Sequence, residues 1–186
     1  MLKKLISLLF LIFVACGSES PEFNGSDISE ANLDGRVELT SHEGLKFDSQ
    51  DLLGNVIAVF FGFTNCPDIC PTSLTELKLI SSEIKNPEKF KIIFVSVDPG
   101  RDTIDILGDY IPRFGKNIYG LTGSKDEVKK VADQFKVFFQ AVPQGESYTI
   151  DHSAGIYLID KDGQVRIRYP FGTNIDLIKA DIDKLI

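Results

Sequence analysis

The sequence predicts an α/β domain built around a central mixed β-sheet. Two apolar runs rich in β-branched and aromatic residues, 56–63 and 90–97, fit strands that are buried on both faces. Between Pro71 and Ile84, apolar residues recur at spacings of three and four, the pattern of an amphipathic helix. A strand, a helix and a second buried strand in this order favour an α/β architecture.

Hydrophobic periodicity and turn residues predict the remaining elements. Ser124 and Glu127 have the spacing of a capping box, which fixes the start of one helix. The order of elements is that of a thioredoxin-like sandwich with a central mixed sheet and an N-terminal β-hairpin. The expected elements are a hairpin over 37–40 and 45–47, a helix over 103–114, a short strand over 118–121, a helix over 124–135, a second hairpin over 155–160 and 164–169, and a last helix over 174–186.

The N-terminus has the pattern of a secretory signal. Two lysines precede an apolar run that ends at Ala15 and is too short to span a bilayer as a mature helix. Residues 13–17 resemble the lipobox of bacterial lipoproteins, in which the peptide is cut before the cysteine and its sulfur receives a diacylglycerol. We therefore expect residues 1–15 to be a lipoprotein signal peptide and Cys16 to anchor the protein on the extracytoplasmic, periplasmic side of a membrane. The alternative is a plain signal peptide with an incidental cysteine.

The rest of the chain divides into a polar tether and one domain. Residues 18–34 are rich in Ser, Glu, Asn, Asp and Gly, so we expect a flexible tether over 16–35. Residues 36–186 have the length of a single domain with one core. The formal net charge is −7 and no basic cluster lies outside the signal, so nucleic-acid binding lacks its main electrostatic driving force.

Cys66 and Cys70 form the candidate site, because they follow the central strand at the edge where α/β sheets place their sites. Near a helix start the two sulfurs can face the same way, and we expect the helix N-terminus to lower both thiol pKa values. After export the pair would tend to form a disulfide. Three intervening residues widen the bite between the sulfurs and favour chelation. Soft thiolates prefer Cu(I), and an added imidazole also suits Cu(II); zinc is the alternative metal, but structural zinc sites use four ligands.

The third ligand must come from the two histidines of the chain. His152 precedes the strand expected at 155–160, where a connecting loop can approach the first strand's carboxyl end. For His152 the alternative is a hydrogen-bonded, partly buried histidine at a strand start. His42 lies in a hairpin turn, where a solvated side chain is the ordinary outcome.

Three motifs carry a family resemblance. They are Gly-Phe-Thr-Asn-Cys-Pro-Asp-Ile-Cys-Pro at 62–71, Ser-Val-Asp-Pro at 96–99 with Arg-Asp-Thr at 101–103, and Asp-His-Ser at 151–153 before Tyr-Leu-Ile-Asp at 157–160. Their order and spacing resemble the Sco/SenC family. The resemblance covers nearly the whole expected domain.

The resemblance implies a membrane-anchored, thioredoxin-like copper protein that helps to assemble the dinuclear copper centre of cytochrome c oxidase subunit II. It implies Cys66, Cys70 and His152 as ligands of Cu(I) or Cu(II), with Cys66 and Cys70 also the redox disulfide. Asp98 matches the Val-Asp-Pro motif, and we expect it either to orient the site or to cap the next segment. Many relatives use a transmembrane helix as anchor, whereas Cys16 here predicts a lipid.

The residues and the resemblance together leave three functions to compare. The first is copper delivery to subunit II or a related acceptor, which needs a thiol reductant to open the cysteine pair. The second is a thiol-disulfide reductase that keeps partner cysteines reduced, which has no evident need of His152. The third is a peroxiredoxin-type peroxidase, but Thr64 stands one residue too close to the cysteine for that pattern and no proline precedes it.

Overall fold

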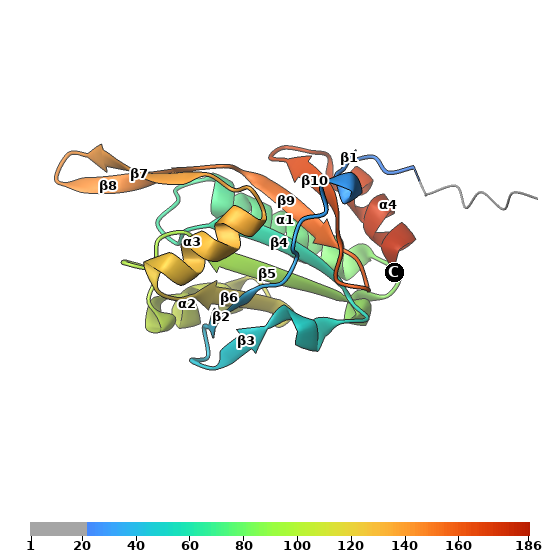
Figure 1. The fold of residues 1–186 in the computed structure, drawn as a ribbon, viewed down its shortest axis with the longest axis horizontal. Helices are drawn as coiled ribbons and strands as arrows, with labels where there is room; N and C mark the ends of the chain where they lie inside the picture. The colour runs from blue at the N-terminus through green and yellow to red at the C-terminus, as the bar shows by residue number, and fades with distance from the viewer. Residues whose placement is uncertain (1–21) are drawn as a thin grey trace, which may run out of the picture.

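An eight-stranded mixed sheet forms the centre of the protein (Figure 1). The computed structural model describes residues 22–186, so the predicted signal peptide and Cys16 lie outside the described residues. Along residues 22–186, no helix combines the length and apolar character needed to cross a membrane. The strands of this sheet, in spatial order, are β1 (Ser26–Asp27), β10 (Val165–Pro170), β9 (Gly155–Ile159), β4 (Val56–Gly62), β5 (Phe90–Ser96), β6 (Ile118–Thr122), β2 (Glu38–Ser41) and β3 (Lys46–Asp48).

Helices cover both faces of the sheet. On one face Phe60 and Phe94 pack together and Phe94 contacts Tyr110, while on the other face Phe61 contacts Phe135. The first face carries α1, α2 and α4, and the second carries α3 (Figure 1). The α-helices are α1 (Ile69–Glu83), α2 (Ile104–Tyr110), α3 (Lys125–Gln134) and α4 (Ile175–Leu185), and the 3-10 helices are η1 (Ser29–Ala31), η2 (Ser49–Leu52), η3 (Pro87–Lys89) and η4 (Ile111–Arg113).

Strand pairing explains why one edge of the sheet gathers the functional residues. β4 and β5 run parallel with Gly62 opposite Ser96, so the loops that leave both strands meet at their carboxyl ends. β9 runs antiparallel to β4 with Ile156 opposite Phe60, so the chain enters β9 at this same edge. All seven residues of β4 are buried. Burial of each large apolar side chain contributes roughly 1.5–3 kcal/mol, which fixes this edge on a stable core.

The predicted thioredoxin-like fold is confirmed. Both buried strands, the N-terminal hairpin, the second hairpin and the last helix form within one or two residues of the expected bounds. The capping box at the start of α3 is present, with Ser124 accepting from the Glu127 amide and Glu127 accepting from the Ser124 amide. The helix expected over 103–114 is shorter, because α2 gives way to η4 where Pro112 removes a backbone donor.

The sequence prediction omitted one hairpin. β7 (Phe139–Gln144) and β8 (Ser147–His152) form a separate two-stranded sheet that extends to one side of the molecule (Figure 1). β7 is almost entirely exposed and lacks the alternation of apolar and polar residues that marks a half-buried strand. β8 does alternate, with Tyr148 and Ile150 between polar residues, but this short pattern was overlooked in the sequence. Gly145, at a φ of 60°, makes the turn between the two strands.

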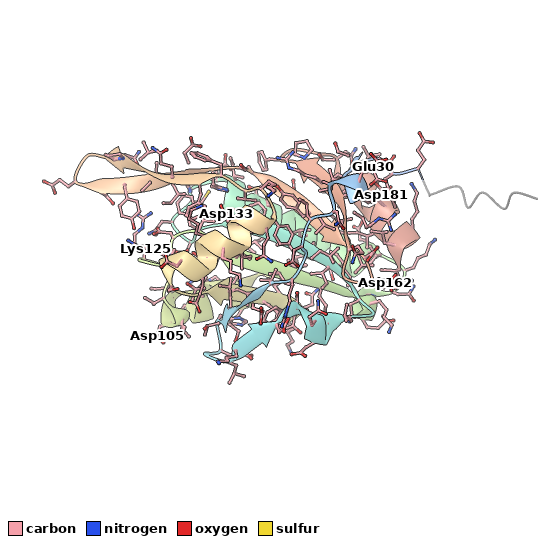
Figure 2. All side chains as sticks on the ribbon, in the orientation of Figure 1. Glu30, Asp105, Lys125, Asp133, Asp162 and Asp181 are labelled. Atoms are coloured by element: carbon pink, nitrogen blue, oxygen red, sulfur yellow. The ribbon has the colours of Figure 1, made fainter. Side chains whose placement is uncertain are left out.

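The flexible tether expected up to residue 35 is wrong for its second half. β1 pairs with the edge strand β10, and Asp181 of α4 accepts hydrogen bonds from the backbone amides of Asn24 and Gly25 at 2.7 and 3.1 Å. A Cβ at Gly25 would lie 2.4 Å from Ile167 and Tyr169, so only glycine fits there. Asp181 lies beside the N-terminal segment in Figure 2, and this buried carboxylate fixes residues that the polar composition assigned to a tether.

Candidate thiol and imidazole site

The two cysteines lie where β4 passes into α1. Cys66 is in the loop and partly buried, whereas Cys70 is in the first turn of α1 and has no exposed surface. Cys70 packs against the end of β4 so closely that a Cβ at Gly62 would lie 2.8 Å from its Sγ. Glycine at position 62 is therefore a site residue that the sequence reasoning missed, because only the absence of a side chain makes room for the sulfur.

Asp102 fixes the loop that precedes Cys66. Its carboxylate is completely buried and accepts hydrogen bonds from the Thr64 amide at 2.9 Å and from the Thr64 hydroxyl at 2.6 Å. The Ser96 hydroxyl at the end of β5 donates to the same carboxylate at 2.6 Å. Asp102 thereby joins the ends of β4 and β5, and such charge-assisted hydrogen bonds are the stronger kind.

His152 reaches the cysteines from β8. It is the last residue of that strand and not part of a loop as the sequence suggested, because residues 139–152 pair as a hairpin. Its Nε2 lies 3.9 Å from Cys70 Sγ, and its ring meets the ring of Phe63 edge to face with centroids 5.9 Å apart. The structure therefore brings together one thiol and one imidazole that are 82 residues apart in the chain.

The Cys66 sulfur lies near Cys70 but is not directed toward His152. It accepts a hydrogen bond from the Cys70 amide at 3.4 Å, and both thiols are free. Among residues 22–186, no three His, Cys, Asp or Glu side chains are grouped closely enough to hold a metal ion as they stand. An ion bonded at about 2.3 Å to sulfur and about 2.0 Å to imidazole nitrogen, the lengths known for zinc, fits between Cys70 and His152. Cys66 has to turn its sulfur from the amide toward that position to act as a third ligand.

Burial sets the protonation of both partners. It raises the pKa of the Cys70 thiol, which corrects the expectation that the helix start lowers both thiol pKa values, since desolvation outweighs the helix here. Burial also lowers the pKa of His152, which favours the neutral imidazole. A neutral imidazole has a free nitrogen lone pair, the form that binds a metal.

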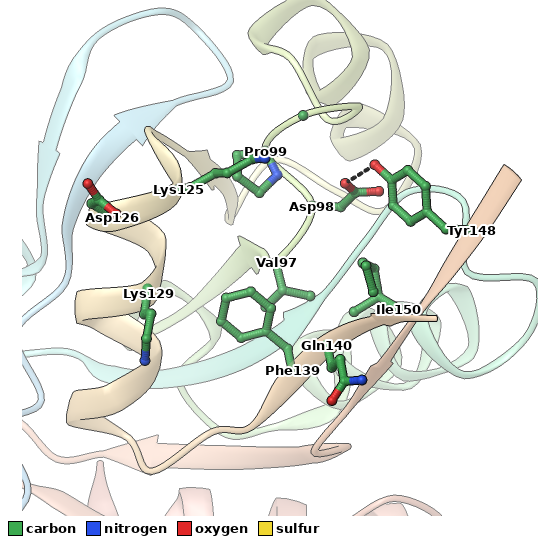
Figure 3. A pocket seen from close by; sticks show the side chains of 12 residues that line it. Val97, Asp98, Pro99, Lys125, Asp126, Lys129, Phe139, Gln140, Tyr148 and Ile150 are labelled. Carbon is green, nitrogen blue, oxygen red and sulfur yellow. Dashed lines mark hydrogen bonds between the residues drawn. The ribbon is translucent and has the colours of Figure 1, made fainter. Parts of the chain in front are cut away.

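Asp98 lies beside the site and contacts the hairpin that carries His152. Only 4% of its surface is exposed, and it forms an ion pair with Arg101. Its Oδ1 accepts a hydrogen bond from the Tyr148 hydroxyl at 2.8 Å (Figure 3). The backbone oxygen of Asp98 also accepts from the amides of Arg101 and Asp102, so the residue both starts the next turn and holds β8.

The remaining candidates lie differently. His42 Nδ1 accepts a hydrogen bond from the Gly120 amide at 3.2 Å, so His42 joins the N-terminal hairpin to β6. Tyr110 of α2 was not singled out from the sequence. Its hydroxyl is buried and has no hydrogen-bond partner within the described part of the chain, and burial together with the nearby Cys70 and Cys66 raises its pKa. The apolar spacing of α2 gave no signal that this ring faces the thiols.

These features define a class of protein: a thioredoxin-like domain in which the buried thiol of a cysteine pair lies beside an imidazole. Residues 25–186 match the family model described as SCO1/SenC, and the chain belongs to the SCO1/SenC family. A SCO2-like protein of Rickettsia felis is 39% identical over 166 residues, which cover 86% of this chain and 80% of the relative.

Two solved structures show the same fold. The copper-bound structure of ScoI from Bradyrhizobium japonicum is 35% identical, with a TM-score of 0.75 over 83% of this chain and 99% of that chain. The structure of BsSco, a member of the Sco family of cytochrome c oxidase assembly proteins in which a disulfide switch has been identified, is 26% identical. Its TM-score is 0.68 over 87% of this chain and 95% of that chain.

Proposed function

We propose that this protein binds copper as a cargo through Cys66, Cys70 and His152 and hands it to a copper acceptor during cytochrome c oxidase assembly. The observation that carries the proposal is the 3.9 Å approach of His152 Nε2 to Cys70 Sγ. Thiolate sulfur and imidazole nitrogen together suit copper in either of its common oxidation states. Copper-bound ScoI, which shares the fold and 35% of the sequence, supports the same cargo.

Transfer follows from the exposure of the ligands. Cys66 keeps some exposed surface whereas Cys70 has none, so an acceptor's thiolate can replace Cys66 first, while Cys70 and His152 still hold the ion. Ligand exchange between soft sulfur donors needs no change in the copper oxidation state. The acceptor we propose is subunit II of the oxidase or a related protein, with the lipidated Cys16 keeping the donor at the extracytoplasmic surface of the membrane where the acceptor's domain lies.

Copper titration of the reduced protein tests this proposal. We expect one equivalent of Cu(I) or Cu(II) to bind, and His152→Ala to weaken Cu(II) binding by more than roughly tenfold, since even residues that only support a metal ligand contribute 10–100-fold. The matched control is His42→Gln, because His42 is the other histidine of the chain. Equal binding by wild type and His152→Ala would remove His152 from the site.

A second candidate function is thiol-disulfide reduction, and the unequal exposure of the cysteines favours it. Cys66, the more exposed of the two cysteines, can attack a partner's disulfide as a thiolate and form a mixed disulfide. Cys70 then attacks Cys66, so one of the partner's thiols leaves with each step and the two electrons of the thiol pair pass to the partner. A disulfide switch in BsSco supports this chemistry in a relative.

The His152→Ala variant separates the two functions. Reduction of a model disulfide should survive this substitution, because the imidazole forms no bond in the exchange, whereas copper binding should weaken. Cys66→Ser should abolish both. If His152→Ala instead lost reductase activity and kept full copper affinity, His152 would act in disulfide reduction and not as a copper ligand.

A further inference from the structure

His152 lies on a hairpin with few attachments to the domain. β7 and β8 form their own sheet, so no hydrogen-bond ladder to the main sheet fixes the position of the imidazole. A cavity of about 440 Å³ separates the hairpin from α3, with Phe139 and Ile150 on one side and Lys125 and Lys129 on the other (Figure 3). An isolated two-stranded hairpin is at best marginally stable. Its position therefore depends on a small number of side-chain contacts.

Tyr148 makes most of the polar contacts along β8. Its hydroxyl donates to Asp98 Oδ1 at 2.8 Å, and its backbone oxygen accepts from Arg101 Nη1 at 2.8 Å. The Arg101 guanidinium carbon lies 3.8 Å from the centroid of the Tyr148 ring, in a cation–π contact. Asp98 and Arg101 are themselves joined as an ion pair, so the tyrosine is held by a preformed cluster.

β8 links the position of Tyr148 to the position of His152. Side chains two apart on a strand share a face, so Tyr148, Ile150 and His152 point to the same side of β8. Ile150, between them, is 92% buried in the main core. A rotation or lift of the hairpin at Tyr148 therefore moves the imidazole away from Cys70.

The cluster also connects to the cysteine loop. The Asp98 amide donates to the Ser96 hydroxyl at 3.1 Å, and this hydroxyl donates to Asp102, which holds Thr64. One continuous set of hydrogen bonds therefore runs from the loop that carries Cys66 to the strand that carries His152. Buried hydrogen-bond networks of this kind fix relative positions, because each member loses a partner if another moves.

We propose that Tyr148 is a positioning residue for His152: its contacts with Asp98 and Arg101 hold the hairpin where the imidazole meets Cys70. The inference deepens the proposed function and rests on it, since the position of His152 matters for copper only if His152 is a ligand. Tyr148 itself does not touch the cargo.

Tyr148→Phe tests the role with little other change. The substitution removes the hydroxyl that Asp98 accepts but keeps the ring on Arg101 and the backbone acceptor. We expect Cu(II) affinity to fall roughly tenfold, because the free energy of a single hydrogen bond to a charged group corresponds to a change of about this size in a binding constant. The Cu(II) absorption and electron paramagnetic resonance spectra should also shift toward those of His152→Ala, which a change in stability alone would not produce. The matched control is Tyr119→Phe on β6, whose ring packs against Phe47 on β3.

A measurement without metal separates this inference from the proposed function. In Tyr148→Phe, amide hydrogen exchange in residues 147–152 should be faster than in wild type, and nuclear Overhauser contacts between the rings of His152 and Phe63 should weaken. Tyr119→Phe should change neither. If the wild type bound copper through His152 but Tyr148→Phe matched Tyr119→Phe in spectrum, affinity and exchange, the positioning role would be overturned while the function stood. If wild type and His152→Ala bound copper alike, the proposed function would fail, and the role of Tyr148 would be decided by the exchange data alone.

Discussion

The two halves of the site are built in different ways. The cysteine half grows out of β4 and β5, whose residues are almost all buried and whose ends are joined by the buried Asp102. The imidazole half is a hairpin outside the main sheet, most of whose residues are exposed. The difference shows that the cysteines are held by the buried core, whereas the imidazole is carried by a separately attached hairpin. We expect substitutions in the first half to affect folding and substitutions in the second to affect mainly binding.

The largest effect should come from Asp102→Ala. The substitution leaves the Thr64 amide and two hydroxyl groups without their acceptor in a buried place. Each lost partner costs on the order of 1 kcal/mol or more, so we expect about 3 kcal/mol less stability in urea denaturation. Asp102→Asn keeps part of the hydrogen bonding and should lose less. A loss below about 0.5 kcal/mol would show that the cysteine loop does not depend on this carboxylate.

Gly62→Ala should come next. The new methyl group would lie 2.8 Å from both Cys70 Sγ and a carbon of Phe94, and overpacking of this kind costs typically 1–3 kcal/mol. Gly100→Ala is the matched control in the turn that faces the hairpin, because its Cβ would meet the Tyr148 hydroxyl at an ordinary 3.9 Å. Thermal unfolding of the two variants compares a tightly packed position beside Cys70 with a loosely packed position beside the hairpin. Equal losses would show that close packing against Cys70 is not what makes position 62 sensitive.

The N-terminal segment over residues 24–27 is, like the hairpin, attached to the domain by a few contacts, and its attachment through Asp181 depends on pH. Burial alone would raise the pKa of Asp181, but hydrogen bonds from Tyr169, Lys184 and the amides of Gly25 and Asn24 lower it overall. Because the folded-state pKa lies below the unfolded value of about 3.9, the stabilisation is complete above that pH. It is lost as the pH falls through the lower folded-state pKa.

Asp181→Asn should therefore cost about 1–2 kcal/mol at pH 7, and the gap to wild type should close as the pH falls below about 4. The exposed Asp162 offers the control, since Asp162→Asn should change stability little at any pH (Figure 2). Urea denaturation at a series of pH values measures both. A gap that stayed constant with pH would mean that the carboxylate charge is not what holds the segment.

The same difference decides how much could be predicted from the sequence. The buried strands are continuous apolar runs, and the apolar residues of α1 recur at helical spacing. The fold and the place of Cys66 and Cys70 were therefore predictable. β7 is exposed and has no such pattern, and the alternation in β8 is short, so the hairpin over 139–152 was not predicted. Asp98 was identified by its motif, but its partner Tyr148 lies 50 residues away, and no local signal pairs them. Burial of Cys70 likewise depends on packing against Gly62, so the direction of its pKa shift could not be found from the helix start alone.

The smallest effect on stability should come from the outer part of the hairpin. Val142 on β7 is exposed and pairs with Thr149, so Val142→Ser removes little buried surface and should change the free energy of unfolding by less than about 0.5 kcal/mol. Native-state hydrogen exchange should nevertheless differ strongly between the two halves. Amides of β4, paired on both sides within the core, should exchange only through global unfolding, whereas those of β7 should exchange through local opening. Equal protection of β4 and β7 would mean that the hairpin unfolds with the core, and the imidazole would then belong to the same rigid unit as the thiols.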